Sequence, residues 1–217
     1  MTDQPVIEII EKEFKNKTLA VTEQYLEIHS PIYVDNNLRI DRIDRDRKDG
    51  LIIVYLPVLG ERFYFSVYID TNINEVVNVG TESFYHVCFR VTSETLSADD
   101  LRVITQLTPT EFWNKGDLKE RGKLRYTFSN LTFLPNPEPD EFKDKLKKLL
   151  DFLEQDKNGV KELVKKADCY IQVEMDIHNG NGMLGEYNID TEDIRRMNEL
   201  GLSINFGIYV SGSNFKD

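Results

Sequence analysis

Residues 169–178 read CYIQVEMDIH, and this stretch decides the fold because its side chains alternate between apolar and polar. A period of two residues is that of a β-strand with one face in a core. Residues 202–210, with the sequence LSINFGIYV, repeat the pattern near the end of the chain. The two apolar sets are Ile171, Val173, Met175 and Ile177 on the first strand, and Leu202, Ile204, Phe206, Ile208 and Val210 on the second. We expect helices to bury both apolar faces. The polar faces are then not covered by helices and are either solvated or covered by something else.

Helical patterns surround these two strands. Residues 142–153 carry leucines on one helical face, a second helix follows Gly159, and a third begins at Asp190 and ends at Gly201. Upstream we expect strands at residues 84–92 and 125–134. Between them, Ser97 and Asp100 have the spacing of a capping box that opens a helix through residue 107.

The first 82 residues show a different order of elements. The spacing of apolar residues predicts a short helix at residues 5–14 and then strands at residues 19–29, 32–43, 51–57 and 62–70. Residues 51–56 are apolar on both faces, so we expect a central strand there. The predicted fold is therefore α+β, with a smaller helix-plus-antiparallel-sheet region at residues 1–82. A mixed, mostly antiparallel sheet with helices on one face follows at residues 83–217.

Composition narrows the class of protein. The formal net charge of -11 opposes the phosphate backbone, so we do not expect nucleic-acid binding. No stretch of the sequence is apolar for long enough to predict a membrane span, and the first residues lack the pattern of a signal peptide. Cys88 and Cys169 lie in apolar runs that predict buried free thiols. We expect a cytoplasmic protein without a cofactor.

The segment around the single tryptophan has the most specific sequence of the chain. Residues 107–117, LTPTEFWNKGD, predict an ordered loop that Phe112 and Trp113 pin, with Trp113 largely buried. With FRVT at residues 89–92 and LGLSINFGIYV at residues 200–210, this segment resembles a bacterial family catalogued as domain of unknown function 4279. The resemblance covers residues 84–215. It implies a compact α+β domain and carries over no reaction, cofactor or catalytic residue.

The polar face of residues 169–178 is the best candidate for chemistry. Glu174, Asp176 and His178 share one side of the strand, and His86 and Arg90 have the same parity on an earlier strand. Two carboxylates and an imidazole at this spacing could hold a metal ion or divide acid and base roles, as in a metal-assisted hydrolase. The same spacing also satisfies an ordinary solvated sheet face. No serine, cysteine or P-loop enzyme signature accompanies it, so we do not expect an enzyme.

Two further segments could contact a partner. The glycine-rich residues 178–185 suit a surface loop, and the arginines and aspartates of residues 39–49 suit either a solvated turn with cross-strand ion pairs or a charged recognition edge. We expect a non-catalytic protein-binding module, of the kind that acts in immunity or regulation, with an acidity that suits a basic partner. A small-ligand sensor with the Trp113 loop as its lid is a further alternative. The candidate binding residues are Arg90, Trp113, Glu174, Asp176, His178, Asn179 and Asn181.

Overall fold

The computed structural model describes residues 3–119, 122–180 and 187–215. The chain forms two compact units. Unit 1 consists of Met1–Phe84, Met175–Gly185 and Ile208–Asp217, and unit 2 of Tyr85–Glu174 and Glu186–Gly207. The ends of two late strands therefore pack with the first part of the chain. A domain boundary near residue 82, in the sense of independent folding, remains a prediction.

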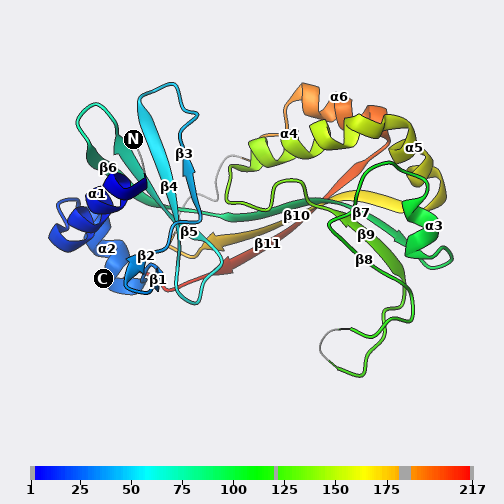
Figure 1. Cartoon of the computed structure of the whole chain (residues 1–217), viewed down its shortest axis with the longest axis horizontal. Coiled ribbons are helices and arrows are strands. Elements are labelled where there is room, and N and C mark those ends of the chain that lie inside the picture. Colours follow the sequence, from blue (N-terminus) through cyan, green and yellow to red (C-terminus); the bar gives the residue numbers. More distant parts are fainter. Residues whose placement is uncertain (1–2, 120–121, 181–186, 216–217) are drawn as a thin grey trace. The chain divides into compact units, whose positions relative to one another are not determined.

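Unit 1 packs two helices on a four-stranded antiparallel sheet (Figure 1). The helices are α1 (Asp3–Asn16) and α2 (Ala20–Ile28), and the strand order is β3 (Arg42–Asp44), β4 (Leu51–Pro57), β5 (Tyr64–Asp70) and β6 (Glu75–Glu82). Val6 and Ile10 of α1 are fully buried in one core with Val54 of β4. Ile53 and Tyr55, on the opposite face of β4, belong to a second buried cluster. The prediction of a central strand at residues 51–57 is confirmed.

Two predicted strands of this region are wrong. Most of residues 19–29 form the helix α2 (Ala20–Ile28), because Thr22, Tyr25 and Leu26 recur at helical spacing and pack toward the core. Residues 32–43 do not form one strand. They contain a small hairpin of β1 (Tyr33–Val34) and β2 (Asn37–Leu38), followed by β3. Asp35 and Asn36 both have positive φ angles, as a two-residue hairpin turn requires.

A five-stranded sheet has the order β11-β10-β7-β9-β8. Its strands are β7 (Phe84–Ser93), β8 (Glu111–Trp113), β9 (Ser129–Phe133), β10 (Asp168–His178) and β11 (Ser203–Ser211). β9 pairs antiparallel with β7 and β8, whereas β10 and β11 run in the same direction (Figure 1). This is the mixed sheet that the sequence predicts. The strand expected at residues 125–134 is shorter, since regular pairing begins at Ser129.

The helices α4 (Phe142–Leu153), α5 (Lys157–Lys166) and α6 (Thr191–Leu200) cover one face of this sheet (Figure 1). A 3-10 turn, η1 (Glu154–Asp156), connects the first two. Asp190 caps α6 by accepting from the backbone N–H groups of Glu192 and Asp193, and Gly201 ends the helix with a φ of 73°. The Ser97 capping box is present, but its helix α3 (Ala98–Arg102) stops five residues before the predicted end.

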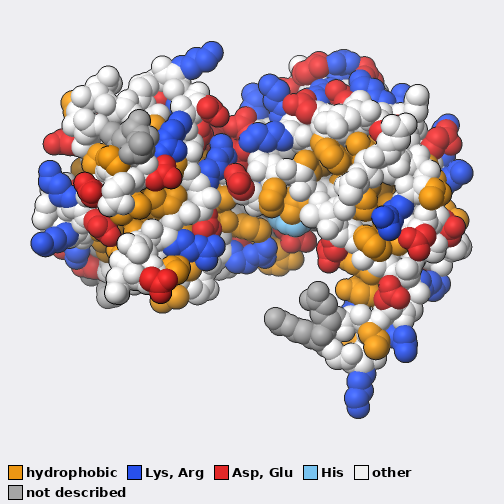
Figure 2. Space-filling model, in the orientation of Figure 1, with side chains coloured by type: hydrophobic (Ala, Val, Ile, Leu, Met, Phe, Trp, Pro, Cys, Tyr) orange, Lys and Arg blue, Asp and Glu red, His pale blue; other side chains and the backbone are white. Residues whose placement is uncertain are grey.

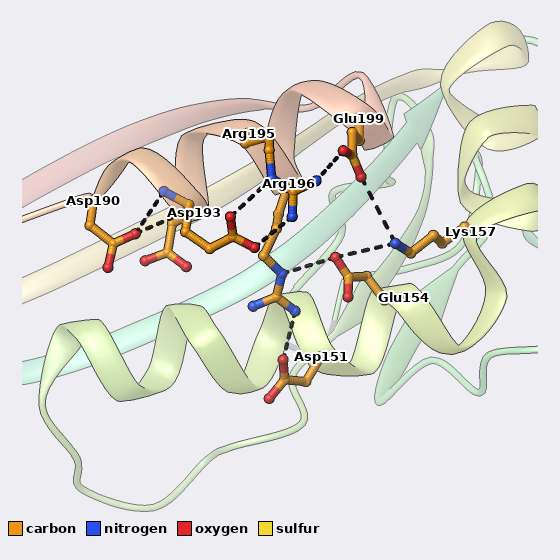
Figure 3. Close-up of polar contacts among 9 residues, drawn as sticks. Asp151, Glu154, Lys157, Asp190, Asp193, Arg195, Arg196 and Glu199 are labelled. Carbon is orange, nitrogen blue, oxygen red and sulfur yellow. Dashed lines mark hydrogen bonds and ion pairs between the residues drawn. The ribbon is translucent and has the colours of Figure 1, made fainter.

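Ion pairs hold α6 on its neighbours within unit 2 (Figure 3). The nearly buried guanidinium of Arg196 donates to Glu154 at 2.9 Å and to Asp151 at 2.6 Å. These two carboxylates belong to η1 and α4, so one side chain connects three elements. Because Arg196 is buried and paired at both ends of its planar fork, its loss would remove the cation that the two carboxylates share and leave Glu154 with Lys157 alone. Across the residues that the structure describes, no helix is long and apolar enough to cross a membrane.

Candidate functional site

Two of the three histidines of the chain meet inside unit 1. His178 is the last residue of β10, and His29 caps the end of α2. Their Nε2 atoms lie 2.8 Å apart, and the exposed fractions of the two residues are 7% for His29 and 1% for His178. A distance of this size between two ring nitrogens is that of a hydrogen bond, in which one ring donates and the other accepts.

The surrounding backbone decides which ring donates. The N–H of Gly180 donates to Nδ1 of His178 at 3.1 Å, so that nitrogen is an acceptor and the proton of the neutral ring lies on Nε2. The carbonyl of Ser213 lies 3.2 Å from the same Nε2 and can only accept. His178 therefore donates through Nε2, which His29 and Ser213 share, and His29 accepts with its own Nε2.

Aromatic rings and two glycines enclose the pair. The ring of Phe63 lies 5.2 Å from that of His29 and 5.0 Å from that of His178, with T-shaped geometry. Tyr25 and Phe215 also contact His178 edge to face. A Cβ at Gly180 would come within 2.5 Å of the His178 ring, so this close approach requires glycine.

Burial lowers the pKa of both imidazoles below the ordinary value, because a charged ring would lose its hydration. The carboxylate of Glu61 opposes this effect at His29, and the proximity of His29 adds to it at His178. Near neutral pH the pair is thus an uncharged N–H···N contact. Among the described residues, no group of three or more histidine, cysteine, aspartate or glutamate side chains could hold a metal ion.

Asp176 has structural partners in the same unit. Its carboxylate accepts from the Ser211 hydroxyl at 3.0 Å and lies 3.4 Å from the guanidinium of Arg62. That guanidinium in turn lies over the ring of Phe84, 4.3 Å from its centroid. Asp176 is only 7% exposed. At this end of β10 the polar face is therefore covered and not solvated, because residues of unit 1 pack over Asp176 and His178.

Glu174 and Arg90 belong to unit 2, on the neighbouring strands β10 and β7. Both are half-buried and both act on Cys88. Burial raises the pKa of the Cys88 thiol to about 12, Glu174 adds to the effect and Arg90 opposes it. Burial likewise raises the pKa of Cys169 to about 12. Both cysteines are free and buried, which confirms the prediction made for them and leaves neither as a ready nucleophile.

The remaining predicted binding residues lie apart from the histidine pair or have local roles. Asn179 donates its amide to Asn214, and Asn181 lies outside the described residues. In the segment at residues 39–49, Arg39, Arg42 and Arg47 each pair with the aspartate two positions further on, and Arg45 pairs with Asp3 of α1.

The Trp113 loop is ordered as predicted. Asn114 and Asp117 bond to each other through their backbone and side-chain groups, and Gly116 takes a φ of 93°. Trp113 is of intermediate burial, and its indole nitrogen is shielded from solvent. The indole stacks on Tyr126 with centroids 4.5 Å apart. Phe112 is 47% exposed under the guanidinium of Arg102.

β11 departs furthest from the predicted burial. Its side chains at Phe206, Ile208 and Val210 are 43%, 49% and 56% exposed, although the alternation predicted that they are buried. Tyr209 on the opposite face is 58% exposed. The physical reason is position, because β11 is the last strand of its sheet and a strand at the edge has a neighbour on one side alone.

A family model described as Domain of unknown function (DUF4279) matches residues 82–211, more than half of the chain. The chain belongs to the DUF4279 family. The resemblance that the Trp113 loop and the last strand suggest is thereby confirmed. The DUF4279 match includes β7 to β11 and leaves out most of unit 1, His29 among it. Neither the curated proteins nor the solved structures contain a significant match to the chain.

Sequence reasoning missed His29 as the partner of His178. The sequence predicts a strand at residues 19–29, which gives His29 no particular partner. In addition, 149 positions separate the two rings in the chain, so no local pattern connects them. A usable signal was present in the glycines at positions 180 and 212. Both approach the His178 ring closely, and a glycine next to a strand end often marks such a contact.

Proposed function

We propose that this DUF4279 protein is a cytoplasmic, non-catalytic protein-binding module that adds an extended segment of another polypeptide to the outer edge of β11. One observation carries the proposal. β11 has no charged residue from Ser203 to Ser211, and its apolar side chains at Phe206, Ile208 and Val210 are exposed at a sheet edge. Extended peptides bind such edges by pairing their backbone with it and inserting alternate side chains.

Comparison with the other edge strands supports this role. Proteins commonly protect sheet edges with charged side chains or with very short strands. β3 and β8 have three residues each and include charged ones, and β6 begins and ends with glutamate. β11 has nine residues and neither protection. A long, uncharged, apolar edge invites aggregation unless a partner covers it.

The backbone of β11 has suitable groups at its outer edge. The N–H of Asn179 donates to the carbonyl of Ser211, so that carbonyl points toward β10. Alternate residues of a strand direct their N–H and C=O groups to opposite edges. The even-numbered residues from Ile204 to Val210 consequently present their backbone groups outward, where the described part of the chain contributes no further strand.

The net charge of the chain would affect how fast a partner approaches, and it would not contribute to the contacts at β11. The net charge of -11 favours encounter with a basic protein, as expected for an immunity or regulatory protein that neutralises its target. On the face shown in Figure 2, acidic and basic side chains are interspersed. The uncharged β11 would then supply the short-range contacts.

The hydrolase alternative lacks comparable support. Its three residues do not share one accessible site, since Asp176 is held by Ser211 and Arg62, and His178 is held by His29. Glu174 belongs to the other unit. The free cysteines fit a reducing compartment, which supports the cytoplasmic location proposed above.

Affinity capture from cells that produce the protein tests the proposal. The wild type is compared with Ile208→Lys, which puts a charge on β11, and with Ile194→Lys, a matched control on α6. The two isoleucines are 49% and 52% exposed, so neither change disturbs a core. We expect proteins that the wild type and the control retain and that Ile208→Lys loses. Equal recovery with all three would show that β11 is not the binding surface.

A further inference from the structure

We propose that the polypeptide that covers β11 is a second copy of the same chain, paired antiparallel to the first about a two-fold axis at Gly207. This inference rests on the proposed binding role of β11. The sequence of the strand, SINFGIYVS, is nearly symmetric about its central glycine. Ser203 mirrors Ser211, Ile204 mirrors Val210, and Phe206 mirrors Ile208. In a two-fold antiparallel pairing each residue meets the residue at the mirrored position of the partner, so this near symmetry places apolar side chains against apolar ones and serine against serine.

The backbone parity fits the same axis. Pairing about Gly207 places Ile204 opposite Val210 of the second copy and Phe206 opposite Ile208. These are the even-numbered residues, whose backbone groups point to the outer edge of β11. Each opposed pair can then exchange two N–H···O=C bonds. Gly207, Asn205 and Tyr209 fall in the non-hydrogen-bonded positions between them.

Side-chain chemistry agrees with the backbone. In this register every pair on the even-numbered face joins two large apolar side chains, and such cross-strand pairs stabilise a sheet. Two copies of an acidic chain repel each other over most of their surfaces, yet the nine residues of β11 carry no charge. Because the pairing uses the same strand of both copies, it closes at a dimer and leaves no second β11 edge for growth.

Measurement of the solution mass is the first test. The purified full chain should have twice the 25.3 kDa of the single chain, with dissociation on dilution. Ile208→Lys should weaken association by at least about tenfold, because its ammonium group would be placed against an apolar partner. Ile194→Lys should associate as the wild type does. A wild type that stays monomeric at all concentrations, or an Ile208→Lys variant that remains as dimeric as the control, would overturn the proposal.

Disulfide trapping tests the register. Asn205 and Tyr209 of opposite copies face each other in a non-hydrogen-bonded pair, with Cα atoms about 4.5 Å apart. A disulfide spans this distance, whereas the two positions of one strand lie about 13 Å apart and cannot be joined. The double variant Asn205→Cys, Tyr209→Cys should therefore cross-link into a dimer under mild oxidation. The single variant Tyr209→Cys should not, and the buried native cysteines give little background. Equal cross-linking of both variants would overturn the register.

The two proposals fail in different ways. In one outcome the wild type is monomeric, but Ile208→Lys still loses a captured protein that Ile194→Lys retains. In that case β11 binds a different polypeptide, and only the inference of a second copy is contradicted. If the wild type is dimeric and Ile208→Lys has no effect on the dimer or on capture, both fall. Polydisperse association beyond the dimer would also contradict the closed pairing, because an isologous contact cannot extend.

Discussion

β10 and β11 are neighbouring strands with the same alternation of polar and apolar residues, yet β10 buries both of its faces at its end, whereas β11 leaves residues of both faces exposed. The polar residues Asp176 and His178 at the end of β10 are buried. The apolar residues Ile208 and Val210 of β11 are about half exposed. The buried polar groups at the end of β10 have hydrogen-bond partners in unit 1, whereas the apolar side chains of β11 are open to solvent in the single chain. The difference shows that alternation separates two faces without stating what covers each.

Position in the sheet explains the difference between the two strands. β10 has a strand on each side, and its last residues pack with α2, Phe63 and the end of the chain in unit 1. Burial of a polar group is costly unless hydrogen bonds replace its water, and His178 and Asp176 each have them. β11 has one neighbour, so side chains of identical pattern remain accessible.

Removal of the His178 side chain should have the largest effect on stability. His178→Ala leaves the Nε2 of His29 without its buried donor and opens a cavity against Phe63, at a cost of about 3 kcal/mol of unfolding free energy. The matched change on the other strand, Ile208→Ala, should cost less than about 1 kcal/mol in dilute protein, since half of that side chain is already in water. Urea unfolding measures the loss of unfolding free energy in both variants. Similar losses in His178→Ala and Ile208→Ala would contradict the contrast between the two strands.

Acidification should act on β10 and leave β11 unaffected. Both imidazoles have lowered pKa values in the folded chain, so the unfolded chain binds protons more readily. The contribution of the neutral histidine pair to the free energy of unfolding is complete above the pKa of histidine in the unfolded chain, about 6.5. This contribution is lost as the pH falls from there through the lower pKa values of the folded chain. His29→Gln can still bond to His178 and removes one titrating ring, so it should flatten the decline. A urea midpoint with the same pH dependence in both proteins would contradict this account.

The sequence predicts local structure well where one short signal is sufficient. The Ser97 capping box, the Asp190 cap and the Gly201 stop are all present, because each depends on bonds within a few residues. Residues 19–29 were assigned to a strand because β-branched and aromatic residues favour strands in general. Packing of Tyr25 and Leu26 on the core of unit 1 outweighs that preference.

The candidate site could be predicted only in part. His178 is visible in the sequence as a polar residue on an alternating strand, whereas its partner His29 depends on a contact between distant segments. The same limit applies to β11, since strand order decides whether its apolar face is covered. Local pattern contains no information about strand order at the edge of a sheet.

Amide hydrogen exchange along β10 and β11, measured at several protein concentrations, tests the central claim most directly. We predict that the amides of Ile204, Phe206, Ile208 and Val210 gain protection as the concentration rises and lose it in Ile208→Lys. The amides of β10 should keep the same protection throughout, because their partners are within the chain. Protection of the β11 amides that depends neither on concentration nor on Ile208→Lys would contradict the account.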